Sequence, residues 1–336
     1  MTQKRGSTYC LWGLALSLAI LFFLSFLWGR LEISPGDVAG ILAERLGLPV
    51  ARTWTDQMVS AVWNVRMPRL VLAMLVGCAL SAAGSAYQCV FQNPMAAPDI
   101  LGASSGACFG ATLAILLEIR AVTAMAFAFS LLTVALVYSI GRRGKGSRTM
   151  NILLAGIMVS SLFSAGISCI KLVADPNSKL PEITYWLMGS LSGARRGDIA
   201  FALLPILLGL VPLLLLRWRI NLLTLGEEEA SSMGVHTGRL RFAVIACATV
   251  LTAASVSAAG MIGWVGLVIP HLCRRMVGND CRHLLPASML GGAFFLLLAD
   301  NISRTLLAVE IPLGILTAFV GAPFFLYLMT RKGGWA

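Results

Sequence analysis

Ten apolar runs, each bounded by charged or turn-forming residues, decide what this chain can fold into. A helix that crosses the hydrocarbon core of a membrane needs about 20 residues at 1.5 Å each, and the runs have roughly this length. They cover residues 11–28, 68–91, 100–118, 121–140, 152–174, 199–216, 242–260, 263–277, 284–306 and 311–330. We therefore predict an all-α, polytopic membrane protein with about ten transmembrane helices, in a single domain over residues 1–336.

Composition excludes a soluble enzyme. Hydrophobic residues make up 58% of the chain and charged residues 12%, against about 45–50% and 25% in soluble domains. Lys and Arg outnumber Asp and Glu by 26 to 15, and in membrane proteins such basic residues collect in cytoplasmic loops rather than marking nucleic-acid binding. The cluster Arg142, Arg143, Lys145 and Arg148 predicts a cytoplasmic loop, and an even number of spans then places both termini in the cytoplasm.

The sequence contains no energy-converting motif. It lacks a phosphate-binding GxxxxGK[ST] and an HExxH, so uphill transport would need an ion gradient or another protein. Intramembrane acids are the usual sign of ion coupling, and Asp300 is the one candidate. It lies four residues before Arg304 and shares a helix face with it, which favours a structural or docking pair over a proton relay. The eight cysteines form no CxxC pair and are expected to pack as small hydrophobic residues.

Small residues suggest close helix packing and an internal repeat. Gly102, Gly106 and Gly110 recur at a spacing of four, which favours intrachain packing over a subunit interface or a cavity lining. The tetrapeptide Ser-Ala-Ala-Gly occurs at residues 81–84 and 257–260, and each copy is followed ten residues after its glycine by a proline. An inverted repeat over about 66–175 and 240–330 would explain this, although a chance match of small residues is the alternative.

Several separate motifs together resemble one family. They read RMPR at 66–69, QCVFQNPMAAPDILG at 88–102, WLMG at 186–189, NLLTLGE at 221–227, GWVGLVIPH at 263–271, PLG at 312–314 and GAPFF at 321–325. In this order and spacing, from about residue 11 to residue 331, the chain closely resembles the FecCD-type permeases. These are the membrane subunits of ATP-binding cassette (ABC) importers for iron-siderophore, haem and cobalamin complexes.

This resemblance implies a fold, partners and a location. The fold would be that of a type II ABC importer permease with ten helices. The partners would be a second permease subunit, expected as a homodimer, two cytoplasmic ATPases that hold ATP and Mg, and a periplasmic or lipid-anchored solute-binding protein. No cofactor is expected in this chain, no nucleic-acid partner is implied, and the location would be a bacterial inner, or cytoplasmic, membrane.

The resemblance also implies a cargo without identifying it. An iron-siderophore complex is favoured, haem and cobalamin come next, and an oxyanion such as molybdate is a further option, because specificity lies largely in the binding protein. The alternative from the residues alone is an ion-gradient-driven secondary transporter. An intramembrane enzyme and a scaffolding subunit are the remaining rivals.

Residues 217–241 are predicted to be the loop that couples the permease to its ATPase. They lie between two spans on the positively charged side and combine Leu222, Leu223 and Leu225 with three glutamates, as expected of a short amphipathic helix that docks on a partner. By resemblance, the residues that contact the ATPase are Leu225, Gly226, Glu227, Ala230 and Gly234.

Two further sites follow from the resemblance. Arg66, Arg69 and Arg304 lie at span ends on the outer side, where related permeases receive carboxylates of the binding protein; anchoring at the membrane surface is the rival interpretation. A cytoplasmic gate is predicted at Asn93, Pro94, Met95 and Thr149. A proline at such a helix end leaves irregular backbone that tolerates hinge-like movement.

Overall fold

The computed structural model describes residues 2–145 and 148–330, and over these residues it consists of helices joined by turns and loops. Ten helices match the predicted runs: α1 (Thr2–Ser25), α4 (Met67–Val90), α5 (Ala103–Leu116), α6 (Val122–Arg143), α7 (Arg148–Val173), α9 (Arg196–Leu223), α11 (Thr237–Ala259), α12 (Val265–Val277), α13 (Cys281–Thr305) and α14 (Leu313–Thr330). Within the described residues, seven helical segments are long and apolar enough to cross a membrane. The other three of the ten are α5, α12 and α14. The predicted all-α membrane fold is confirmed.

Hydropathy does not predict the shorter helices. These are α2 (Pro35–Arg45), α3 (Asp56–Ser60), the π-helix η1 (Ala61–Arg66), the 3₁₀ helix η2 (Pro98–Leu101), α8 (Lys179–Leu187) and α10 (Glu227–Ser232). The start of α2 follows local rules, because the Ser34 side chain accepts a hydrogen bond from the Asp37 backbone and Pro35 occupies the first helical position. A continuous segment of 35 residues, made of α3, η1 and α4, runs from Asp56 to Val90.

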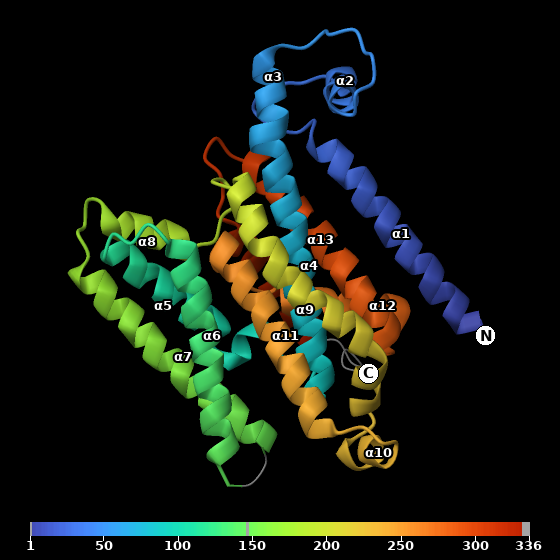
Figure 1. The fold of residues 1–336 in the computed structure, drawn as a ribbon, viewed down its shortest axis with the longest axis vertical. Helices are drawn as coiled ribbons and strands as arrows, with labels where there is room; N and C mark the ends of the chain where they lie inside the picture. Colours follow the sequence, from blue (N-terminus) through green and yellow to red (C-terminus); the bar gives the residue numbers. More distant parts are fainter. Residues whose placement is uncertain (1, 146–147, 331–336) are drawn as a thin grey trace.

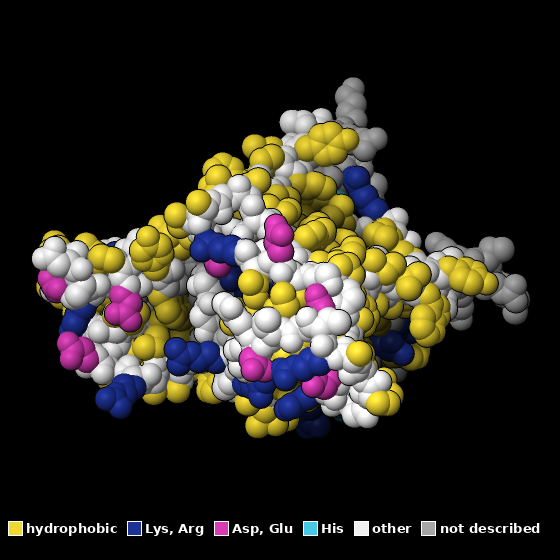
Figure 2. Space-filling model, turned by 90° about the horizontal axis from the view of Figure 1, so that it is seen from above, with side chains coloured by type: hydrophobic (Ala, Val, Ile, Leu, Met, Phe, Trp, Pro, Cys, Tyr) yellow, Lys and Arg dark blue, Asp and Glu magenta, His cyan; other side chains and the backbone are white. Residues whose placement is uncertain are grey.

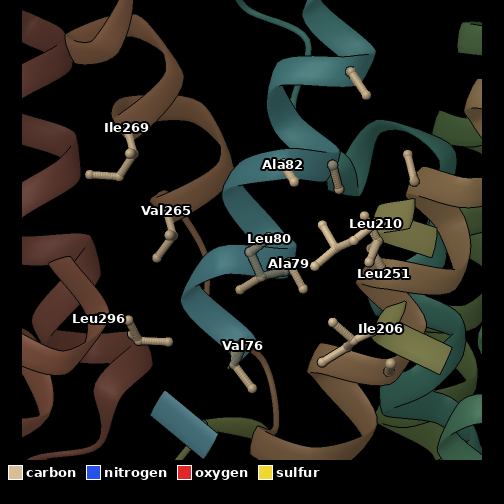
Figure 3. Packing of buried hydrophobic residues seen from close by; sticks show 14 of the residues in the cluster. Val76, Ala79, Leu80, Ala82, Ile206, Leu210, Leu251, Val265, Ile269 and Leu296 are labelled. Carbon is tan, nitrogen blue, oxygen red and sulfur yellow. The ribbon is translucent and has the colours of Figure 1, made fainter. Parts of the chain in front are cut away.

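Helix α4 forms the centre of the bundle (Figure 1). Its residues are almost entirely buried from Leu80 onward. Figure 3 shows Val76, Ala79, Leu80 and Ala82 of α4 between two groups of side chains from other helices. One group comes from α12 and α13, and the other comes from α9 and α11. A central helix surrounded in this way is shielded from lipid over most of its length.

Glycines allow the central helices to approach one another closely. A Cβ atom added to Gly84 would lie 1.7 Å from the Gly266 carbonyl oxygen, and one added to Gly77 would lie 2.2 Å from that of Gly292. The stripe on α5 has the same role, since a Cβ on Gly106 would lie 1.9 Å from the Thr133 hydroxyl oxygen of α6. In lipid no hydrophobic driving force holds helices together, and the close packing that small residues allow stabilises their contact instead. The interpretation of this stripe as intrachain packing is confirmed.

The bundle has two distinct ends, which we name the α3 end and the α10 end (Figure 1). The α3 end carries α2 and α3. The α10 end carries α10 and the described residues on either side of 146–147. The start of α1 also lies toward the α10 end, where the Ser7 hydroxyl donates a hydrogen bond to the Val277 carbonyl over 3.3 Å. The alternating directions of the ten helices bring the end of α14 to the same side; that this side is cytoplasmic stays a prediction.

Asp280 begins α13 at the α10 end. Its side chain accepts a hydrogen bond from the Arg282 backbone over 3.0 Å, and it forms an ion pair with the Arg282 guanidinium over 2.8 Å. Partial burial raises the pKa of Asp280, but the hydrogen bonds from Arg282 outweigh burial and hold the pKa below its ordinary value. The carboxylate therefore stabilises the first turn of α13.

The structure corrects helix boundaries near two of the predicted sites. Helix α9 continues to Leu223 and α11 begins at Thr237, so the segment that joins them is 224–236 rather than the predicted 217–241. Helix α7 begins at Arg148 rather than at residue 152, so Thr149 lies in its first turn, at a helix end as predicted. Apolar runs report contact with lipid, whereas backbone hydrogen bonding extends a helix past the membrane surface, where arginines such as Arg217 and Arg219 are solvated.

Candidate functional site

A cluster of buried charges lies at the α3 end. The Arg69 Nε donates to Asp300 Oδ1 over 2.8 Å, and the Arg69 Nη1 donates to both carboxylate oxygens of Glu310, at 3.0 and 2.9 Å. On the other side of Asp300, the Arg304 Nε is 3.7 Å from Oδ2. The Asp300 side chain is fully buried. The predicted pair of Asp300 and Arg304 is confirmed, and Arg69 is an additional partner.

Two arginines of this cluster hold the end of α1. Arg66 donates to the carbonyl oxygens of Phe26 and Leu31, and Arg304 donates to the Ser25 carbonyl over 2.8 Å. The Ser25 carbonyl ends α1, where helix carbonyls have no partner within the helix, and the Phe26 and Leu31 carbonyls follow it in the chain. Arg66 and Arg304 therefore tie the end of α1 to η1 and α13.

The structure does not present Arg66, Arg69 and Arg304 on the surface as a docking site would require. All three are buried, and Arg304, the most exposed of them, is 8% exposed. Arg69 and Arg304 pair with carboxylates of the chain itself, and Arg66 donates to backbone carbonyls. Figure 2 shows positive, negative and apolar side chains interspersed at the α3 end. A docking role for these arginines stays a prediction and would require a partner to displace the intrachain bonds.

The predicted coupling residues gather at the α10 end. Gly226 and Gly234 flank α10 with φ angles of +123° and +80°, which L-residues with a side chain rarely adopt. Ala230 is buried, whereas Leu225 is 57% exposed. Glu227 begins α10, and its side chain lies outside the described part of the chain.

Leucine burial in this segment differs from the expectation. Leu222 and Leu223 belong to the last turn of α9 and are buried, so they stabilise the bundle and are not available to a partner. The exposed large apolar side chains are those of Leu225, which precedes α10 in the chain, and Met233, which follows it. Beside α10, a groove of about 740 Å³ runs between α9 and α11 and is lined by Gly234, Val235 and Leu240, among others.

The predicted gate segment follows α4 at the α10 end. Asn93 and Pro94 line a cavity of about 500 Å³ together with Gln88, His271 and Arg274. The Asn93 side chain accepts a hydrogen bond from the Met95 backbone over 2.8 Å and so stabilises the turn. The lining of this cavity does not include Thr149. The structure thus groups two of the four predicted gate residues, and a gating role stays a prediction for all four.

Asp99 is an intramembrane acid that sequence reasoning missed. It lies in η2, between Pro94 and the start of α5, and lines two cavities together with Trp264. Its signal in the sequence is the pair of prolines at 94 and 98, which prevents a regular helix in between. Because the predicted span begins at residue 100, the sequence places Asp99 in a solvated loop.

The described residues contain no group of three or more His, Cys, Asp and Glu side chains placed to hold a metal ion. The site is therefore described by its charges, cavities and helix ends.

Comparisons with known proteins agree with this architecture. The model of the FecCD transport family matches residues 17–331. Among similar proteins, the molybdate import system permease protein MolB of Haemophilus influenzae is 39% identical over 96% of both chains. A probable iron chelatin transport system permease protein of Helicobacter pylori is 41% identical over 81% of this chain and 83% of its own length. The hemin transport system permease protein HmuU of Yersinia pestis is 37% identical over 85% of this chain and 89% of its own.

A solved structure shows the same fold. It is described as an inward-facing conformation of an ABC transporter of the metal-chelate type, and it matches with a TM-score of 0.86 and 38% sequence identity. The match covers 96% of this chain and 99% of the solved chain. The family match runs from the middle of α1 to the end of α14 and so includes the second half of α1 and every later helix described above. The chain is therefore a multi-pass membrane permease that belongs to the FecCD transport family.

Proposed function

We propose that the chain is the membrane-spanning subunit of an ATP-driven importer that carries an iron chelate across the inner membrane. An iron-siderophore complex is the first candidate, and haem or cobalamin is the next. Two of the three relatives described above are named for iron chelatin and hemin, and the third is named for molybdate. In this proposal two ATPase subunits bind ATP and Mg, a solute-binding protein delivers the cargo, and a second copy of the chain completes the permease.

The surroundings of Asp300 favour ATP-driven over ion-driven transport. A coupling carboxylate must exchange its ion with water during each cycle. Asp300 is fully buried and lies between Arg69 and Arg304, so both of its oxygens face cations of the chain itself. This arrangement favours a structural role for Asp300 and leaves the energy supply to a partner protein.

The α10 end supports contact with an ATPase. Exposed Leu225 and Met233 offer apolar area on a short helix whose two ends are fixed by glycines in unusual conformations. A short helix of this kind fits into a groove on a partner. Because α10 packs between α9 and α11, movement of α10 would be passed directly to two long helices of the bundle.

Reconstitution tests the proposed function. The permease, its ATPase and its binding protein are placed in proteoliposomes, and uptake of a ferric siderophore is measured with ATP. A second set of vesicles contains the permease alone under an imposed proton gradient. We expect uptake in the first set and none in the second. Gradient-driven accumulation by the permease alone would refute the proposal.

A further inference from the structure

Asp99 lies near the middle of the bundle along its long axis. The neighbouring Pro98 approaches α4 and α12, because a Cβ added to Gly266 would lie 2.6 Å from Pro98 and 2.7 Å from the Leu80 carbonyl. On the other side of Asp99, a Cβ added to Gly156 would lie 2.2 Å from the Ile100 carbonyl. Leu80 is the fourteenth of the 24 residues of α4, and Gly156 is the ninth of the 26 residues of α7. The chain therefore returns to mid-depth at Asp99.

Within the described residues, the Asp99 carboxylate has one side-chain hydrogen-bond partner and no ion pair. The Ser104 hydroxyl donates a hydrogen bond to its Oδ1. Among residues 2–145 and 148–330, no Lys or Arg forms an ion pair with it. The contrast with Asp300, which lies between two arginines, is clear. Arginines therefore neutralise Asp300, whereas no described Lys or Arg neutralises Asp99.

Asp99 faces open space rather than the protein core. Its side chain is exposed, and it lines a cavity of about 770 Å³ together with Met188, Met261, Trp264 and Phe319. A carboxylate at this depth does not face lipid, because hydrocarbon cannot solvate it; such groups face water-filled cavities and mark the routes of substrates. We therefore expect the cavity beside α14 to contain water rather than lipid.

We infer that Asp99 contacts the cargo and makes the pathway selective by charge. A carboxylate in a cavity that Trp264 also lines attracts a cationic group through its charge, and the negative face of the indole ring adds to the attraction. The same carboxylate repels an anion. This inference rests on the proposed function, and it narrows the cargo to chelates whose outer surface is cationic or neutral. Free oxyanions such as molybdate are disfavoured, although one relative is named for molybdate.

Chelates that share one metal core and differ in the charge of a single side group test this inference. Three ferric trihydroxamates share one neutral metal core and carry a free amine, an N-acetyl group or an N-succinyl group, which makes them cationic, neutral and anionic. Their equilibrium binding is measured by dialysis against the full-length chain in lipid nanodiscs, without ATP or binding protein. For a charged group about 6 Å from a carboxylate in a wet cavity, exchanging the amine for the succinyl group changes affinity by about tenfold. We expect the cationic chelate to bind more tightly by this factor.

Matched variants assign the effect to Asp99. Asp99→Asn should bring the ratio of cationic to anionic binding close to one, and Asp99→Glu should retain it. Glu118→Gln is the control, because Glu118 is exposed, lies past the far end of α5 and pairs with Lys179 over 2.8 Å. It removes the same charge outside the cavity and should leave the ratio unchanged.

Three outcomes would overturn the inference: a ratio near one in the wild type, an unchanged ratio in Asp99→Asn, and no binding of any of the chelates. Loss of ATP-driven uptake in the reconstituted system has a different meaning. With an intact charge ratio, it would refute the proposed function and support the role of Asp99 in charge selection.

Discussion

Neutralising Asp300 tests whether the charge cluster at the α3 end holds the fold together. Asp300→Asn keeps the shape of the side chain and removes its charge. Arg69 then retains Glu310, at 2.9 Å, but both Arg69 and Arg304 lose their shared buried carboxylate. Removing one partner of a buried ion pair leaves an uncompensated charge and costs about 3–5 kcal/mol. We expect this loss in the free energy of unfolding for Asp300→Asn, and a similar loss for Arg69→Met.

The double variant shows whether the two residues act on each other. Asp300→Asn with Arg69→Met removes both charges, so its cost should fall short of the sum of the single costs by about 2–3 kcal/mol. The control is the exposed pair Arg52 and Asp56, whose side chains are 51% and 94% exposed. Removing that pair should cost less than about 1 kcal/mol, since water screens it.

Reversible unfolding in mixed micelles, followed by circular dichroism during titration with sodium dodecyl sulfate, measures these free energies. Single variants at Asp300 or Arg69 that cost no more than the control would refute the structural role. Additive costs in the double variant would show that the two residues are not coupled. ATP-driven uptake per folded molecule should survive in the double variant, and its loss with unchanged stability would instead assign Asp300 to transport.

Three other substitutions have defined outcomes. Gly84→Ala should destabilise the bundle by about 3 kcal/mol in the same titration, because the new Cβ meets a backbone carbonyl, whereas Gly13→Ala in α1, with no atom within 4 Å, should not destabilise it. Gly226→Ala strains a backbone with φ of +123° and should lower cargo uptake per ATP hydrolysed; unchanged coupling would remove α10 from the mechanism. Asp280→Asn should cost about 0.5–1 kcal/mol at pH values above about 4. That difference should vanish as the pH falls through the lowered pKa of Asp280, since the wild-type carboxylate then becomes protonated.

The sequence is sufficient to place the spans because contact with lipid dictates apolar composition directly. The start of α4 at Met67 and the end of α12 at Val277 each fall within one residue of the predicted run. Helix continuation beyond the membrane is not encoded in hydropathy, and α9 therefore extends seven residues past its predicted end at residue 216.

Long-range partners set the limit of prediction for the site. Spacing of four residues reveals the pair of Asp300 and Arg304, but the stronger contact joins Asp300 to Arg69, 231 residues away. An arginine at the end of an apolar run was expected to face water, because the sequence does not show that a carboxylate from another helix neutralises it. The polar segment around α10 is predictable from the sequence because polar residues separate two apolar runs there; its coupling role stays a prediction. The sequence does not distinguish Leu225, which is exposed, from Leu223, which is buried in the last turn of α9.

The irregular segment that precedes α5 explains both why this helix is short and why the Asp99 carboxylate is exposed. Between Phe91 and Gly102 the backbone turns back to mid-depth without a regular helix, stabilised by local bonds such as Ala96 N to Asn93 O and Gly102 N to Asp99 O. Irregular backbone at this depth is tolerated only where protein buries it or water reaches it. Gly156 and Gly266 provide the buried part by letting the segment pack closely against α7 and α12. The remaining side, at Asp99, lines a cavity, and water in that cavity would solvate the carboxylate, which is the condition that a route for hydrated cargo requires.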